Sequence, residues 1–213
     1  MNCSALANAE VVTCSGIVPM RDRDDKISIT DFGGVGDGVT LNTKAFRKAI
    51  YRIEHLQRIG GTILHIPPGV YLTGPFNLTS HMTLYLAGGA VIKAIMNTEN
   101  WPLVAPLPSY GRGRERPGGR YMSFIHGDGL DDVIITGENG TIDGQDPLLF
   151  PAQATALTRS FPLISDVVIQ YLTILAPADS PNTDGIDPEV SLELKIEFDV
   201  VKLGKVASMP LDV

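Results

Sequence analysis

Residues 133–144, Val-Ile-Ile-Thr-Gly-Glu-Asn-Gly-Thr-Ile-Asp-Gly, contain two short apolar runs with a turn between them. The runs 133–136 and 140–144 have the length of β-strands and are too short for helices. Asn139-Gly140 is a turn dipeptide, because both residues accept positive φ angles. The stretch therefore predicts a strand, a tight turn and a second strand.

Similar strand–turn units recur on both sides of this stretch. Comparable units follow one another at roughly 20–35 residues, a spacing typical of proteins that stack successive coils. Asn139-Gly140 is the single Asn-Gly pair, which disfavours an antiparallel sandwich and favours a parallel solenoid. The further strands are predicted at residues 27–30, 62–66, 70–73, 82–86, 90–94 and 167–174.

One segment, residues 43–59, has the period of a helix. Its apolar residues form a single stripe, made of Ala45, Phe46, Ala49, Ile50, Ile53 and Leu56. Thr40 or Asn42 is expected to cap its start, and Gly60-Gly61 to end it. An early helix before a run of strands predicts a cap over the exposed end of the solenoid.

Two segments interrupt the strand pattern. Residues 97–120 form a long irregular stretch that contains Arg112, Arg114, Arg116 and Arg120. These arginines either attract an anionic polymer or form local ion pairs on a solvated loop, and both readings stay open. Residues 146–166 show neither the helix nor the strand period.

Composition narrows the class of protein. The 213 residues are 44% hydrophobic and 19% charged, which suits one globular domain. We expect a tail at residues 1–25 and a single, incomplete domain of stacked strands at 26–213. The net charge of −7 argues against a nucleic-acid partner. No apolar run is long enough for a transmembrane helix, and the first residues lack a signal-peptide pattern. Cys3 and Cys14 are either a disulfide or two thiols.

Several longer motifs resemble plant polygalacturonase-like proteins of glycoside hydrolase family 28. The resemblance covers about three-quarters of the chain, and its later segments are the more specific ones. The matching segments are 29–38 (Ile-Thr-Asp-Phe-Gly-Gly-Val-Gly-Asp-Gly), 42–46 (Asn-Thr-Lys-Ala-Phe), 107–115 (Leu-Pro-Ser-Tyr-Gly-Arg-Gly-Arg-Glu), 134–145 and 175–187 (Leu-Ala-Pro-Ala-Asp-Ser-Pro-Asn-Thr-Asp-Gly-Ile-Asp).

This resemblance implies an all-β, right-handed parallel β-helix with one N-terminal capping helix. It implies hydrolysis of α-1,4-galacturonosyl links in pectin by an inverting mechanism, in which two carboxyl groups roughly 6.5–9.5 Å apart serve as acid and base. It further implies a secreted, cell-wall monomer that binds pectin or polygalacturonate. No metal or other cofactor, nucleic acid or membrane is expected to take part.

The family's first catalytic motif is present as Asn182-Thr183-Asp184. By resemblance Asp184 is a catalytic aspartate that positions or activates water, and Asn182 and Asp187 contact substrate. After Pro188 the sequence departs from the family pattern, without the Gly-Asp-Asp, Gly-His-Gly and Arg-x-Lys motifs expected there. Asp131-Asp132 and His126-Gly127 precede the first motif, so we interpret the aspartate pair as a turn and assign neither pair a catalytic role.

The missing motifs lead us to expect a C-terminally truncated β-helix with an internal deletion near 146–166. We expect this chain to be an inactive polygalacturonase-like hydrolase. The alternatives are a non-catalytic pectin-binding fragment and a non-functional gene or transcript product. Residues 192–200 alternate apolar and charged side chains, which predicts a strand that stacks on the preceding coil.

Overall fold

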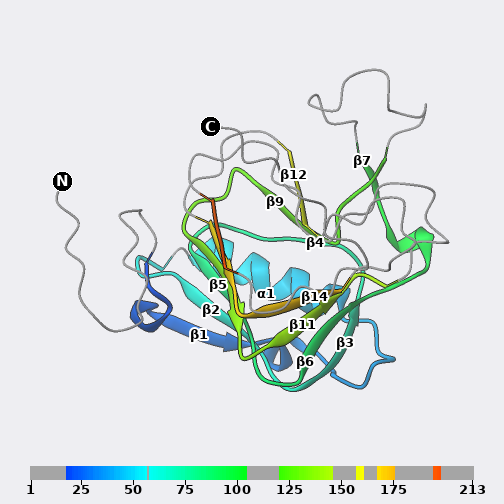
Figure 1. Cartoon of the computed structure of the whole chain (residues 1–213), viewed down its shortest axis with the longest axis horizontal. Coiled ribbons are helices and arrows are strands. Elements are labelled where there is room, and N and C mark those ends of the chain that lie inside the picture. Colours follow the sequence, from blue (N-terminus) through cyan, green and yellow to red (C-terminus); the bar gives the residue numbers. More distant parts are fainter. Residues whose placement is uncertain are drawn as a thin grey trace.

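A computed structural model describes residues 18–56, 58–104, 120–145, 157–160, 167–175 and 194–197. Within these residues the chain winds into coils whose strands stack in parallel on three sides, as Figure 1 shows. Sheet A has the order β1-β2-β5-β10-β13-β15, sheet B β14-β11-β6-β3, and sheet C β12-β9-β4. Each coil that the structure describes through all three sheets passes from A to B to C before it returns to A.

The strand bounds follow the predicted apolar runs closely. Sheet A contains β1 Asp25–Ser28, β2 Thr62–Ile66, β5 Met82–Leu86, β10 Val133–Gly137, β13 Val167–Gln170 and β15 Leu194–Glu197. Sheet B contains β3 Gly69–Thr73, β6 Ala90–Ala94, β11 Gly140–Asp143 and β14 Leu172–Leu175. Sheet C contains β4 Phe76–Asn77, β9 Ile125–Asp128 and β12 Leu157–Ser160. The remaining elements are η1 Met20–Asp22, η2 Ile29–Phe32, α1 Thr43–Leu56, η3 Thr98–Asn100, β7 Leu103–Val104 and β8 Arg120–Tyr121.

The core lies inside the coils, where aliphatic side chains from successive strands stack in register. Leu64 pairs with Leu84 and Leu84 with Ile135, and all three are at most 1% exposed. Because side chains alternate along a strand, this register places every second residue inside and its neighbours outside. Burial of such aliphatic rows is the main favourable term in folding.

Left-handed residues make the corner between sheets A and B. Asn139 and Tyr171, with φ of 58° and 55°, immediately precede β11 and β14. Such angles are uncommon for residues other than glycine, and asparagine accepts them more readily than tyrosine does. We predicted one strand over residues 167–174, but the bend at Tyr171 divides it into β13 and β14, which belong to different sheets.

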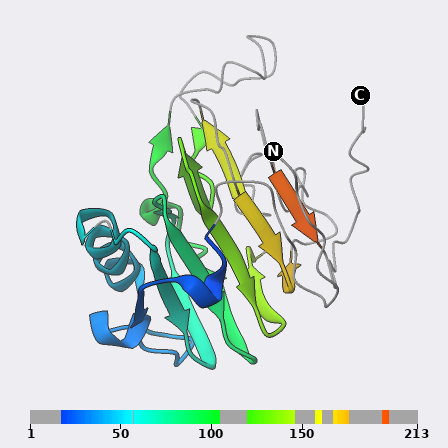
Figure 2. The same cartoon turned by 90° about the vertical axis from the view of Figure 1, so that its left-hand side faces the viewer.

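Helix α1 covers the end of the stack that carries the first strands, as Figure 2 shows. Its buried stripe includes Phe46, whose ring stacks on Phe76 of β4 with centroids 4.6 Å apart. The predicted capping role is therefore confirmed. Asn42 does not cap α1 through its side chain, which bonds the backbone of Val35, Thr40 and Leu72 instead.

Three further predictions differ from the structure in detail. The first strand begins and ends two residues earlier than predicted, because Ile29–Phe32 forms a 3-10 turn that Ser28 and Asp31 cap. The segment 146–166, for which no strand was predicted, contains β12, paired with β9. Part of the predicted strand at 192–200 is present as β15, which pairs with β13 as expected.

An insertion interrupts the third coil between sheets B and C. Its two ends pair as the antiparallel strands β7 and β8, and its buried Trp101 side chain donates a hydrogen bond to the carbonyl of Ile95. The arginines at 112, 114 and 116 lie outside the described residues. Among the helices that the structure describes, none has the length and apolar character needed to cross a membrane.

Candidate functional site

The predicted site residues Asn182, Asp184 and Asp187 all lie outside the described residues. Their motif follows β14 in the sequence, and β14 is a strand of sheet B. In each of the three preceding coils a strand of sheet B leads to a strand of sheet C: β3 to β4, β6 to β9 and β11 to β12. Sheet C is therefore the described surface most relevant to the predicted site.

The outer face of sheet C carries polar side chains. Phe76 and Ile125 are register partners that point into the core, so their neighbours Asn77 and His126 point outward. Asp128 lies two residues beyond His126 on the same face and is exposed. An amide, an imidazole and a carboxylate in this arrangement can donate and accept hydrogen bonds to a polar polymer such as a polysaccharide.

His126 is held in place by the segment before its strand and by the residue that follows β4 on the neighbouring coil. Its Nδ1 lies 3.0 Å from the hydroxyl oxygen of Ser123, and its carbonyl accepts a 2.7 Å hydrogen bond from the backbone N–H of Leu78. Gly127 between His126 and Asp128 points inward, where a Cβ would lie 2.5 Å from Leu130 Cδ1. The strand is thus packed against the core while His126 keeps its half-buried outward position.

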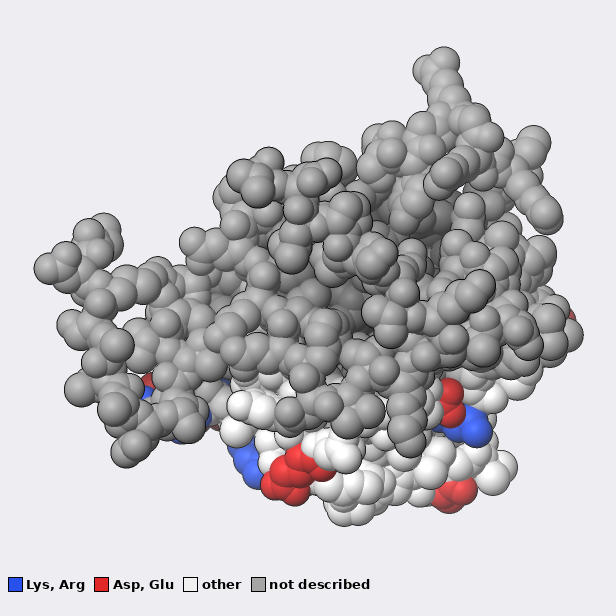
Figure 3. All heavy atoms as spheres, in the orientation of Figure 1, with Lys and Arg blue, Asp and Glu red and all other residues white. Residues whose placement is uncertain are grey.

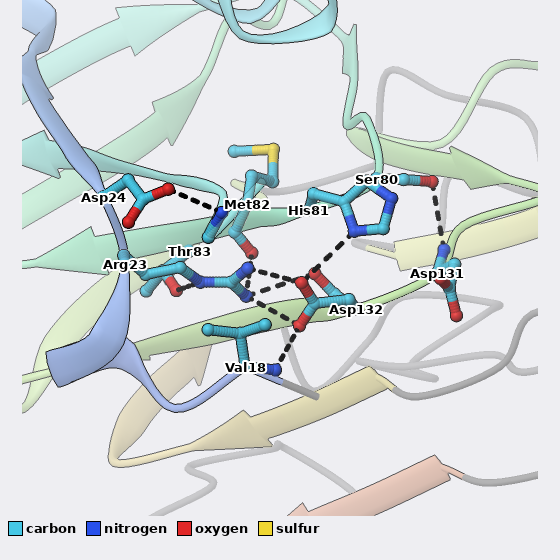
Figure 4. A network of polar contacts seen from close by, with 10 residues as sticks. Val18, Arg23, Asp24, Ser80, His81, Met82, Thr83, Asp131 and Asp132 are labelled. Atoms are coloured by element: carbon cyan, nitrogen blue, oxygen red, sulfur yellow. Dashed lines mark hydrogen bonds and ion pairs between the residues drawn. The ribbon is translucent and has the colours of Figure 1, made fainter. Parts of the chain in front are cut away.

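A second polar cluster lies where the central strands β5 and β10 of sheet A begin, and there Arg23, His81 and Asp132 meet (Figure 4). The Arg23 guanidinium forms a bidentate ion pair with the Asp132 carboxylate, and its Nε donates to Thr83 Oγ1 at 3.1 Å. The same carboxylate accepts from the backbone N–H of Val18 at 2.8 Å and lies 3.3 Å from His81 Nδ1.

This cluster is structural, although it contains the residue types of an acid–base site. The side chains of Arg23 and Asp132 are 0% and 1% exposed, so a polysaccharide cannot reach them. Arg23 also donates to the carbonyls of Met82 and Asp132, which gives every nitrogen of the guanidinium a partner. We name the pair Arg23–Asp132 the N-terminal clamp, because it joins the segment before β1 to the start of β10.

The clamp was not foreseen from the sequence. Asp132 does occupy a turn, with φ of 54° immediately before β10, so its interpretation as a turn residue is confirmed. Arg23 stands in a run of mixed charges, 21–25, at the end of the segment that the sequence predicts to be a tail. Its burial depends on an aspartate 109 residues away, and no local pattern encodes that contact.

A third group of side chains, on the outer face of sheet A, has pKa values that differ from their ordinary values. The Tyr85 hydroxyl donates to Glu138 Oε1 at 2.6 Å, and the backbone N–H of Gly88 donates to Glu138 Oε2 at 3.2 Å. The bond to Glu138 is the main cause that raises the pKa of Tyr85 to about 12, and the same bond lowers the pKa of Glu138. Burial is the main cause that lowers the pKa of His65, whose ring stacks on Tyr85.

These groups do not form a catalytic pair or a metal centre within the described part of the chain. His55 sits on α1 with its Nδ1 2.8 Å from the carbonyl of Tyr51, which is a helix contact. Among the described residues no three or more His, Cys, Asp or Glu side chains gather where they could hold a metal ion.

Known proteins resemble this chain in both sequence and structure. A grapevine (Vitis vinifera) protein described as a probable polygalacturonase is 44% identical over 205 residues, a match that covers 82% of this chain and 42% of the relative. No family model matches the chain. The chain thus spans less than half the length of this relative.

Two solved structures share the fold. A hyperthermoactive exopolygalacturonase from Thermotoga maritima matches with a TM-score of 0.57 and 21% identity, over 86% of this chain and 48% of that one. A polygalacturonase from Erwinia carotovora matches with a TM-score of 0.56 and 19% identity, over 89% of this chain and 57% of that one. At these identities the structural likeness establishes the fold alone, and the 44% identity to the grapevine protein over 82% of this chain makes the chain polygalacturonase-like in sequence. The chain is a polygalacturonase-like protein with the right-handed parallel β-helix fold.

Proposed function

We propose that this chain belongs to a protein that hydrolyses α-1,4-galacturonosyl linkages of pectin outside the cell, in the cell wall. The observation that carries the proposal is the 44% identity to the probable polygalacturonase of grapevine. The coil order supports it, because each earlier coil passes from sheet B to the polar face of sheet C, and the motif Asn182-Thr183-Asp184 follows β14 of sheet B.

In this proposal Asp184 is one carboxylate of an inverting mechanism. It activates the attacking water, while a second carboxyl group protonates the oxygen of the leaving sugar. Asn182 and Asp187 bind the substrate beside it. The partner is a single chain of pectin or polygalacturonate bound by a monomer, and neither nucleic acid nor a membrane takes part.

We further propose that the chain of 213 residues has no hydrolytic activity by itself. The family's Gly-Asp-Asp motif, which supplies the remaining aspartates, is not found among residues 188–213. A general acid contributes about 10²–10⁴ to the rate, because the leaving sugar oxygen must be protonated as the glycosidic bond breaks.

The test is a reducing-end assay of the purified chain on polygalacturonate. We expect no release of reducing ends above an enzyme-free blank, either from this chain or from an Asp184→Asn variant, which serves as the matched control. Release that the Asp184→Asn variant lacks would contradict the proposed inactivity and support the role of Asp184. Release that both proteins show equally would contradict the role of Asp184 as well.

A second candidate function, binding of pectin without hydrolysis, rests on the insertion between β7 and β8. This insertion carries arginines at positions 112, 114 and 116, and Arg120 begins β8. The described surface in Figure 3 shows acidic and basic side chains in small mixed groups instead. Retention on a polygalacturonate column that falls as salt rises, and that is lost when these arginines become glutamine, would favour this function.

A further inference from the structure

The capping helix α1 has an outer face that is strongly basic. The helix lies outside the strands at one end of the stack, and its apolar stripe is buried against them (Figure 2). Residues 43–58 contain five of the 17 basic residues of the chain and one of its 24 acidic residues. A chain whose net charge is −7 therefore concentrates positive charge on this helix and its C-terminal end.

Four exposed side chains form a row along the middle of this face. Lys44, Lys48, Tyr51 and His55 follow one another at spacings of four, three and four residues, so they lie on one side of the helix. All four are exposed, whereas the apolar stripe on the opposite side is buried. At 1.5 Å per residue the row is about 17 Å long, which suits a polymer better than a small ion. We name these four residues the α1 row.

The positive charges of the α1 row are not neutralised. Within the described part of the chain, no carboxylate forms an ion pair with Lys44 or Lys48, although Arg52 on the flank of the helix pairs with Asp25 at 2.7 Å. Glu54, the one acidic residue of the helix, is exposed. Like charges four residues apart repel each other, and the dipole of the first turn disfavours a cation at Lys44. The two lysines therefore do not stabilise the helix.

The other half of the α1 row is aromatic. The Tyr51 ring is 61% exposed and stacks on the His55 ring with centroids 3.7 Å apart. The Nδ1 of His55 lies 2.8 Å from the carbonyl oxygen of Tyr51, which can only accept, so in the neutral ring Nδ1 carries the proton and Nε2 is an acceptor. An exposed ring can pack against the C–H face of a sugar, while the Tyr51 hydroxyl and Nε2 bond to sugar hydroxyls.

Arg47 links the α1 row to sheet C. The side chain is exposed, and its Nη2 donates a 3.3 Å hydrogen bond to the carbonyl of Pro75, the residue before β4. Strand β4 is the edge strand of sheet C, and its outward residue Asn77 is exposed. A polymer that lies across the outward side chains of sheet C therefore meets α1 where it passes beyond β4.

We propose that the α1 row is a docking surface for polygalacturonate, separate from the catalytic site. In this proposal, which rests on the proposed function, the occupant is the polymer assigned to the site at Asp184. Lys44 and Lys48 attract its carboxylates, and the stacked rings of Tyr51 and His55 contact its sugar rings. Because an ester carries no charge, the surface selects segments of the polymer whose carboxylates are free.

Binding of the intact chain to polygalacturonate, measured by titration calorimetry at low salt, tests the proposal. The test variant is Lys44→Gln/Lys48→Gln. The control Lys26→Gln/Lys93→Gln makes the same change of net charge on the outer faces of sheets A and B. We expect the dissociation constant to rise about tenfold in the test variant and less than about twofold in the control. Equal effects of the two pairs, or no effect of the first, would overturn the proposal.

Polyglutamate, which carries carboxylates without sugar rings, serves as the comparison polymer. We expect Tyr51→Ala to weaken binding of polygalacturonate by about threefold or more and to leave binding of polyglutamate unchanged. Equal loss for both polymers would contradict the contact with sugar rings. A native chain that binds polyglutamate as tightly as polygalacturonate would contradict the proposed function as well. A preference for polygalacturonate that Lys44→Gln/Lys48→Gln leaves intact would overturn the docking surface alone.

Discussion

Replacement of Arg23 by methionine tests whether the N-terminal clamp stabilises the fold. The substitution removes five hydrogen bonds, which join Arg23 to Thr83, Met82 and Asp132. The Asp132 carboxylate then stays buried at 1% exposure with only the Val18 N–H and His81 beside it. Removal of one partner of a buried ion pair costs about 3–5 kcal/mol, because the charge that remains is uncompensated.

Arg21 provides the matched control, since it lies two residues away in the same charge run. Its side chain is 61% exposed and its ion pair with Asp22 measures 3.7 Å, so Arg21→Met is expected to cost at most about 0.5 kcal/mol. Urea denaturation followed by circular dichroism gives both free energies of unfolding.

A double-mutant cycle separates the ion pair from the loss of packing. Asp132→Asn keeps a side chain that accepts the φ of 54° but leaves the Arg23 charge unpaired. We expect the double variant Arg23→Met/Asp132→Asn to be more stable than the sum of the single changes predicts, by about 1–3 kcal/mol. The reasoning fails if Arg23→Met costs no more than Arg21→Met, or if the two single costs simply add.

Three further predictions concern the core, a corner and a surface bond. Phe46→Ala should lower the free energy of unfolding by about 3–5 kcal/mol in urea denaturation, because Phe46 stacks on Phe76 beneath the capping helix. The control Leu56→Ala, at the exposed end of α1, should lower it by less than about 1 kcal/mol. Equal losses would contradict the capping role. Gly140→Ala should lower the free energy of unfolding by about 1–3 kcal/mol, because the new Cβ would lie 2.3 Å from Leu86 Cβ. Gly88→Ala should be tolerated, because its Cβ would have no neighbour closer than 3.5 Å. The packing argument fails if Gly88→Ala is the more destabilising of the two. The raised pKa of Tyr85, about 12, means that the bond to Glu138 stabilises the fold fully below pH 10 and that this contribution is lost as the pH rises towards 12. Between pH 8 and 11 the melting temperature of Tyr85→Phe should therefore fall less than that of the native chain and of the exposed-tyrosine control Tyr51→Phe, and parallel curves for all three would refute this.

The strands were predictable from the sequence because each is a short apolar run that ends at a turn residue. The runs 62–66, 82–86 and 90–94 coincide with β2, β5 and β6, since burial on one face imposes the alternation that the sequence shows. The split at Tyr171 was not predictable, because tyrosine gives no local sign of a left-handed angle. The strand β12 was missed for a different reason: its four residues lack alternation, and its pairing with β9 is a long-range contact.

The candidate site, like the fold, could be predicted from local sequence only in part. The outward positions of Asn77 and His126 follow from alternation once sheet C is known, but the sequence alone did not show that β4, β9 and β12 share a sheet. The N-terminal clamp depends on a contact between residues 109 positions apart, which leaves no periodic signal. The assignment of Asp184 came from the family resemblance and stays a prediction, because that residue lies outside the described part of the structure.

The stacking of the last described coils on the earlier ones is tested most directly by a disulfide across sheet B. Thr141 of β11 and Thr173 of β14 are register partners that point outward, so cysteines at both positions should lie within bridging distance. In a chain with Cys3 and Cys14 replaced by serine, we expect mild oxidation to join Thr141→Cys and Thr173→Cys nearly completely. The control pair Thr141→Cys and Leu175→Cys, two residues out of register and about 8 Å apart between Cα atoms, should stay reduced. Failure of the first pair to form, or equal bridging of both pairs, would contradict a single parallel β-helix that continues through β14.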